Sequence, residues 1–197
     1  MKAKKHETKD EKPLVVGIGG TTRAESSTDR ALRVSLRSAE AAGARTVLFD
    51  GGYLSRLPHY APDHAARNEE QRRLVDAVRG ADGLIVASPG YHGGVSGLVK
   101  NALDLLEDLR DDRRSYLDGR AVGCVVSAAG WQAGVSTLGA LRSIVHALRG
   151  WPTPFGATLN TSGRIFDSAG ACTDKNVTAQ LELVGRQVVE FALHYRR

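Results

Sequence analysis

Residues 19–28 carry the side chains best suited to binding an anion. The segment opens with two glycines, which allow tight backbone turns. It also contains three hydroxyl groups and one cation that suit a phosphate: Thr21, Ser26, Thr28 and Arg23. An apolar run precedes the segment and an expected helix follows it, so unpaired amides at the helix start would point toward the same ligand. The pattern predicts a phosphate-binding loop, and the alternative is a plain connection in which a serine or threonine only caps the helix.

Two familiar nucleotide-binding motifs do not fit this loop. A dinucleotide fingerprint that starts at Gly17 requires glycine where Thr22 stands, and the chain has no Gly-Lys-Ser/Thr sequence of the Walker type. Asp50 ends the second apolar run, as a ribose-binding carboxylate would. A divergent dinucleotide site therefore remains the minor alternative.

Residues 88–97 have the composition of a cradle for a planar ligand. Four of the eight residues 90–97 are glycine, and Tyr91 would supply an aromatic wall beside exposed backbone amides. The spacing alone leaves a second interpretation open, in which the glycines only shape turns, Tyr91 packs on the core, and Lys100 and Asn101 lie on a solvated helix face. A flat heterocycle is the ligand that the first interpretation favours.

Residues 127–134 form a third loop, which contains mainly small residues. Small side chains there would keep a crevice open. Trp131 suits two roles equally well, which are contact with a ligand and burial against another subunit.

The elements that must position these loops alternate along the chain. Short apolar runs predict five strands, at residues 14–18, 46–49, 84–87, 122–126 and 155–159. Segments with helical periodicity predict helices at residues 28–42, 69–79, 98–109, 136–148 and 174–195. Such alternation implies right-handed crossovers, so we expect a three-layer, doubly wound α/β fold with a five-stranded parallel sheet. Ligands of such sheets bind beyond the carboxyl ends of the strands, where all three loops lie.

The length of 197 residues favours a single domain, at roughly 150 residues per domain. Residues 1–12 are rich in Lys, Glu and Asp and have no periodicity. We expect them to form a disordered N-terminal tail, followed by one domain over residues 13–197.

Composition excludes several functional classes. The net charge of +5 is spread without a basic block and aromatic residues make up only 6%, so we expect no nucleic-acid binding. No apolar run approaches the length of a membrane span and no apolar signal region opens the chain, so we expect a cytoplasmic protein with no membrane contact. The two cysteines and the histidines lack metal-ligand spacing, and Cys124 lies in an apolar run as an inert core thiol would. We predict no metal site.

Together these segments resemble the NADPH-dependent FMN reductase family, which has a flavodoxin-like fold. The resemblance covers about residues 14–159 and rests on two motifs, whose usual forms are G-S-x-R-x-x-S and S/T-P-x-Y-x-G-S-x-P-G-x-L-K-N-A-x-D. The second motif is long enough to be specific, and here it stands at residues 88–104. This chain departs from the usual forms at Thr21, which keeps a hydroxyl, at Gly94, which removes a possible donor, and at Ser96. Trp131 and Gln132 stand where many relatives have small residues, which would alter the second substrate that fits.

The resemblance implies that the first loop holds the phosphate of FMN and the second loop its isoalloxazine ring. The implied phosphate ligands are Thr21, Arg23, Ser26 and Thr28. The implied ring ligands are Pro89, Gly90, Tyr91, His92 and Gly93. Because the flavin would lie across all three loops, Ser127 and Gly130 join the predicted cofactor-binding set. No catalytic side chain is predicted, since a flavin carries the chemistry itself.

We therefore expect an NAD(P)H-dependent FMN reductase, which transfers hydride from NADPH or NADH to FMN and supplies reduced flavin to a partner monooxygenase. One alternative is an FMN-containing reductase of quinones, azo dyes or metal oxyanions. A second is a non-catalytic flavodoxin-like electron carrier, against which the positive net charge argues because such carriers are commonly acidic.

Residues 98–106 are apolar at more positions than one buried helix face requires. The resemblance implies a homodimer or homotetramer with flavin sites near the interface. We therefore expect part of this segment to face another subunit, with Tyr116 or Trp131 of a neighbour closing the pocket.

Overall fold

The computed structural model describes residues 12–63 and 66–195, so the predicted tail lies outside the described residues except for Lys12. Within that part of the chain, the sheet is built from β1 (Leu14–Gly19), β2 (Arg45–Phe49), β3 (Gly83–Tyr91), β4 (Gly94–Val95), β5 (Ala121–Ala128), β6 (Trp151–Pro152) and β7 (Ala157–Asn160). The parallel strands run in the order β2-β1-β3-β5, and β6 and β7 pair one after the other along β5. Five parallel positions in this order form the flavodoxin-like sheet, which confirms the predicted fold class.

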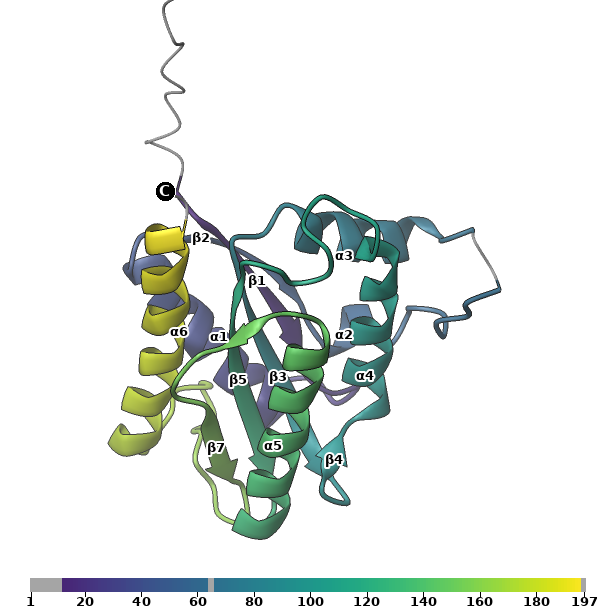
Figure 1. Ribbon diagram of the computed structural model, residues 1–197. Coiled ribbons are helices and arrows are strands. Elements are labelled where there is room, and N and C mark those ends of the chain that lie inside the picture. The colour runs from purple at the N-terminus through teal and green to yellow at the C-terminus, as the bar shows by residue number, and fades with distance from the viewer. Residues whose placement is uncertain (1–11, 64–65, 196–197) are drawn as a thin grey trace, which may run out of the picture.

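Helices cover both faces of the sheet (Figure 1). They are α1 (Ser27–Ala41), α2 (Gly51–Leu54), α3 (Glu69–Arg79), α4 (Gly97–Asp104), the 3-10 helix η1 (Leu105–Leu109), α5 (Trp131–Ala147) and α6 (Lys175–Tyr195). α1 and α6 pack side by side on one face, while α3, α4 and α5 cover the other. The molecule therefore has the three layers expected of a doubly wound fold.

The central strands are apolar at consecutive positions because each of their faces meets a helix layer. In β5, Val122 packs in the cluster under α3, α4 and α5, and Val125 packs in the cluster under α1 and α6. Gly123 lets α6 approach closely, since a Cβ on it would lie 2.5 Å from Cγ1 of Val184. Burial on both faces is what a continuous apolar run predicts for a parallel strand.

The second predicted loop is largely a strand and a tight hairpin. β3 continues to Tyr91, four residues beyond its predicted end, and pairs antiparallel with β4. His92 and Gly93 form the turn with φ of 54° and 79°, the left-handed conformations that a two-residue turn of type I′ requires. The predicted strand ended at residue 87 because proline is rarely found inside a central strand. In the structure, however, Pro89 continues β3 and pairs in register with Ser127 of β5.

The third predicted loop is shorter than expected, because α5 starts at Trp131 and not at residue 136. Gly134 was taken as a loop residue, but it lies inside the helix and is buried. A Cβ at Gly134 would come 2.4 Å from Cγ2 of Thr158, so glycine there allows α5 to pack against β7. The start of the helix was missed because glycine has a low helix propensity in solution.

The apolar segment at residues 98–106 is covered by its own domain. Val99, Leu103, Leu105 and Leu106 are all buried in the core beneath α3, α4 and α5. The reason given for a subunit contact at this segment is therefore wrong. Among the described residues, no helix combines the length and hydrophobicity needed to cross a membrane.

Candidate functional site

A cavity of about 440 Å³ lies beyond the carboxyl ends of β1, β3 and β5, where the fold predicts a ligand site. We call it the loop cavity. Its lining comes from all three predicted loops and from the segment after β7: Thr21, Thr22, Arg23, Ser26, Ser27, Thr28, Pro89, Gly90, Tyr91, Ser127, Ala128, Ala129 and Thr161. The structure thus brings together segments that lie more than 130 residues apart in the sequence.

The first loop is held in shape by its own hydroxyl groups. Oγ1 of Thr21 accepts a hydrogen bond from Arg23 N at 3.2 Å and lies 3.2 Å from Arg23 O, to which the hydroxyl donates. Ser26 caps α1, and its Oγ accepts a hydrogen bond from Asp29 N at 3.2 Å. These bonds use Ser26 as an acceptor and leave its hydroxyl proton available to a ligand.

Arg23 is the cation of this loop, and its side chain is exposed. Across the described part of the chain, its guanidinium forms no ion pair or hydrogen bond with protein. It stands beside the start of α1, where unpaired amides and the helix dipole also attract an anion. An unpaired guanidinium in this position suits a phosphate group.

Two predicted ligands, Thr28 and Ser127, bond to each other at the floor of the cavity. Their hydroxyl oxygens lie 2.5 Å apart, and the residues are 2% and 5% exposed. One of the two hydroxyls must donate to the other, so at most one of the two protons is free for a ligand. The bond joins α1 to β5 across 99 residues of sequence and so fixes the width of the cavity floor.

The second loop supplies one wall of the cavity. Pro89, Gly90 and Tyr91 line it, and the Tyr91 side chain is 57% exposed at its edge. Gly90 lies tightly against α5, since a Cβ there would be 2.9 Å from Oγ1 of Thr137 and 3.1 Å from Cβ of Ala128. A backbone with no side chain next to an aromatic ring is the surface a flat heterocycle needs, so these residues fit an isoalloxazine.

Three residues of the predicted set do not line the cavity. His92 and Gly93 form the hairpin turn next to it, where Gly93 faces Ser136 of α5. Gly130 is the residue before α5. Their contact with a flavin stays a prediction.

Thr161 lines the cavity but was missing from the predicted set. Its amide donates to Ala128 O at 2.8 Å, which fastens the segment after β7 to the end of β5. The signal was present in the sequence, because residues 160–163 follow the fifth predicted strand and hence also lie at a carboxyl end.

A second hollow of about 320 Å³ shares Thr21, Thr22 and Arg23 with the loop cavity and is also lined by Asp50, the candidate ribose ligand of the minor alternative. Both oxygens of Asp50 are engaged, Oδ1 with the amide of Tyr53 at 2.9 Å and Oδ2 with Nη2 of Arg33 at 3.3 Å. Arg33 also bonds Asp29, and this bond raises the pKa of Arg33. Asp50 therefore serves as a helix cap and an ion-pair partner, which argues against the dinucleotide alternative.

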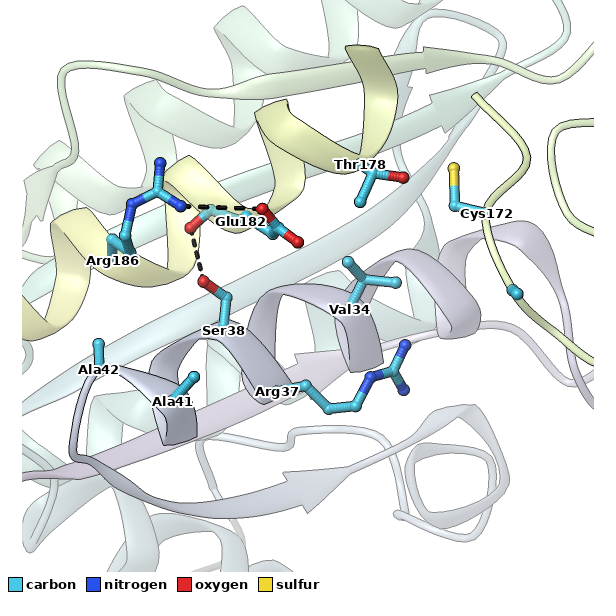
Figure 2. Close-up of a pocket in the computed structure, with 10 residues that line it drawn as sticks. Val34, Arg37, Ser38, Ala41, Ala42, Cys172, Thr178, Glu182 and Arg186 are labelled. Carbon is cyan, nitrogen blue, oxygen red and sulfur yellow. Dashed lines mark hydrogen bonds and ion pairs between the residues drawn. The ribbon is translucent and has the colours of Figure 1, made fainter. Parts of the chain in front are cut away.

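A larger cavity of about 580 Å³ lies between α1 and α6 and involves none of the predicted ligands (Figure 2). Its polar groups are mostly paired. Ser38 donates to Glu182 O at 2.8 Å, and the Glu182 carboxylate lies 3.9 Å from the guanidinium of Arg186. This cavity involves none of the three predicted loops, so the loop cavity is the better candidate site.

The chemistry of the loop cavity points to a bound cofactor. Its lining contains no carboxylate, histidine or cysteine, and the described residues include no cluster of metal-binding side chains. Cys124 is fully buried in β5, and burial raises its pKa to about 12, which confirms an inert thiol. Hydroxyls, one cation and an aromatic wall can bind and orient a ligand, which suits a cofactor that carries its own chemistry.

Comparison with known proteins assigns most of the chain to a family. Residues 13–162 match the family described as NADPH-dependent FMN reductase. The chain is 29% identical over 91 residues to an NADPH azoreductase of Bacillus sp. (strain OY1-2), covering 46% of this chain and 48% of that protein. It is 34% identical over 86 residues to an FMN-dependent NADPH-azoreductase of Staphylococcus aureus, covering 44% of this chain and 42% of the relative. The chain thus spans about half the length of these relatives.

The fold recurs in a solved structure, the flavoenzyme NAD(P)H:(acceptor) oxidoreductase FerB of Paracoccus denitrificans. The two superpose with a TM-score of 0.76 over 93% of this chain and 98% of the other, at 20% identity. The family match covers most of the chain and includes both glycine-rich motifs. The chain therefore belongs to the NADPH-dependent FMN reductase family.

Proposed function

We propose that the loop cavity binds FMN and that the protein is an NAD(P)H-dependent oxidoreductase that uses it. The observation that carries the proposal is the unpaired guanidinium of Arg23, which shares one cavity with the start of α1 and with the wall formed by Gly90 and Tyr91. One cavity thus offers a cation for a phosphate and a flat surface for a ring, and FMN carries both of these groups. Membership in the family supports the same ligand.

Each part of the cavity then has a distinct task. Arg23 and the hydroxyl of Ser26 bind the phosphate, while Thr28 and Ser127 contribute the one hydroxyl proton that their mutual bond leaves free. Thr21 donates to the phosphate only if its hydroxyl exchanges its bond to Arg23 O for the ligand. The neighbouring wall orients the ring through its backbone. When bound, FMN supplies the ability to accept a hydride from NADPH or NADH and to pass electrons to an acceptor.

The electron acceptor separates two candidate functions. In the first, the protein reduces FMN that exchanges with solution and supplies it to a monooxygenase. In the second, FMN stays bound and the protein reduces an aromatic acceptor such as an azo dye or a quinone. Tyr91 favours the second, because it lines the loop cavity, is 57% exposed and offers a ring for a planar acceptor to stack on. The azoreductase names of two relatives agree with it.

Steady-state oxidation of NADPH tests both candidates. A free-flavin reductase shows saturable dependence on added FMN, whereas an acceptor reductase reconstituted with FMN depends on the azo dye or quinone and not on further FMN. An electron carrier would give neither, and flavin would stay oxidised under anaerobic NADPH. That last result would contradict the proposed function.

Three further expectations remain predictions. They are assembly into a homodimer or homotetramer, a location in the cytoplasm and, for the first candidate, a partner monooxygenase. The exposed side chains of Trp131 and Val135, one turn apart on α5, offer a better subunit contact than the buried segment at residues 98–106. Sedimentation at micromolar concentration tests the assembly, and a monomer would reject it.

A further inference from the structure

Arg30, near the start of α1, bonds to two separate loops that both line the loop cavity. Its Nη2 lies 3.0 Å from Oε2 of Glu25 in the first loop, and its Nη1 donates to Asp167 O at 2.6 Å. The Arg30 side chain is only 18% exposed, whereas that of Glu25 is 77% exposed. A single guanidinium therefore connects segments 142 residues apart. We call Arg30, Glu25 and Asp167 the clasp.

The Asp167 end of the clasp belongs to an ordered turn in the segment that begins at Thr161. Asp167 N donates to Ala171 O at 2.9 Å, and Gly170 N donates to Asp167 O at 3.2 Å. The first residue of the segment, Thr161, lines the loop cavity, while Ala171 lines the cavity between α1 and α6. Arg30 thus fixes the middle of a segment whose start forms part of the site.

The Glu25 end of the clasp carries two unfavourable features. Its φ is 53°, a left-handed conformation that costs energy for any residue with a side chain. Its carboxylate also places a negative charge two residues from Arg23, in a loop suited to an anion. The Arg30 guanidinium compensates that charge through its contact with the carboxylate.

We propose that Arg30 is a positioning residue for phosphate binding, because it neutralises Glu25 and ties the first loop to the segment after β7. The inference rests on the proposed binding of FMN. Without Arg30, the free carboxylate of Glu25 repels the phosphate dianion, and the first loop loses its link to the segment that starts at Thr161. A flavin without a phosphate does not experience the repulsion. The loss therefore falls on FMN far more than on riboflavin.

The test is a fluorescence titration of the full chain with FMN and with riboflavin, in low salt and in 0.5 M salt, roughly the range over which screening becomes strong. The variants are Arg30→Ala, Arg30→Lys, Glu25→Gln and the double variant Arg30→Ala/Glu25→Gln. Arg37→Ala is the matched control, since Arg37 lies on the same helix and, within the described residues, makes no ion pair with protein. Thermal melting checks that each variant folds.

We expect Arg30→Ala to raise the Kd for FMN about three- to fivefold in low salt, the size expected of an exposed charge that acts through space, while the Kd for riboflavin stays unchanged. Salt should shrink the difference, Arg30→Lys should restore part of the affinity, and the double variant should recover affinity relative to Arg30→Ala.

An unchanged Kd for FMN in Arg30→Ala, or equal losses for FMN and riboflavin, would overturn the inference. If Arg30→Ala does not fold, Arg30→Lys decides the matter by the same comparison of FMN with riboflavin. Wild-type protein that binds no FMN would instead overturn the proposed function, and with it this inference.

Discussion

Replacing Arg23 by alanine should weaken FMN binding without affecting the fold. The guanidinium is exposed and, among the described residues, has no protein partner, so its removal breaks no ion pair. The hydrogen bonds between Thr21 and Arg23 use the backbone of Arg23 and survive the change. The free energy of unfolding should change by less than about 0.5 kcal/mol, which corresponds to about 2 °C in melting temperature for a domain of this size.

The loss of affinity follows from the same geometry. A hydrogen bond to a charged group contributes about 1.5 to 3 kcal/mol, so the Kd for FMN should rise about tenfold to 150-fold. A solvent-exposed charge that acts only from a distance would contribute less than about 1 kcal/mol, or roughly fivefold. Fluorescence titration separates the two, with riboflavin as the control ligand and Arg37→Ala as the control variant. A change in the Kd for FMN below about fivefold would refute the assignment of Arg23 to the phosphate.

Other substitutions test the remaining parts of the account. Gly93→Val should destabilise the hairpin by about 1–2 kcal/mol, because φ at this position is 79°, and should weaken the binding of FMN and of riboflavin alike. Gly93→Asn should bind both ligands like wild type, because asparagine tolerates that φ. Equal binding by the two variants would show that the turn is only a connection. Thr28→Val and Ser127→Ala should be non-additive in chemical denaturation by about 1 kcal/mol, since either change removes the same buried bond, and additive effects would argue against that bond. At pH 8, a thiol reagent should label Cys172 and leave Cys124 unmodified until the protein unfolds. Because burial raises the pKa of Cys124 from 9.0 to about 12, the free energy of unfolding should fall between pH 9 and pH 12 by up to about 1.4 kcal/mol per pH unit. Cys124→Ala should remove this contribution to the pH dependence of stability.

The sheet and the location of the site could be predicted because they depend on local patterns. Apolar runs such as the one containing Val125 mark strands buried on both faces, and the loops after such strands must lie at one edge of the sheet. Most of the predicted phosphate ligands follow from this single argument. The residues indicate a ligand with a phosphate and a planar ring, and the family resemblance identifies that ligand as FMN. The match to the family agrees with this identification.

The remaining features depend on long-range packing, which the local pattern does not contain. Pro89 and Gly134 were interpreted by their usual preference for loops, but one lies in a strand and the other in a helix that must approach β7 closely. The bond between Thr28 and Ser127 leaves at most one of their two hydroxyl protons for a ligand, and the clasp joins Arg30 to Asp167 across 137 residues. Propensity gives no information about such contacts.

Anaerobic mixing of the FMN-loaded protein with NADPH tests the central claim most directly, since it requires the bound flavin to accept electrons from the nicotinamide. We predict that the absorbance of oxidised flavin disappears without any added reductase, and that Arg23→Ala at the same FMN concentration loses most of this signal while Arg37→Ala keeps it. Flavin that stays oxidised in the presence of wild-type protein and NADPH would contradict the claim.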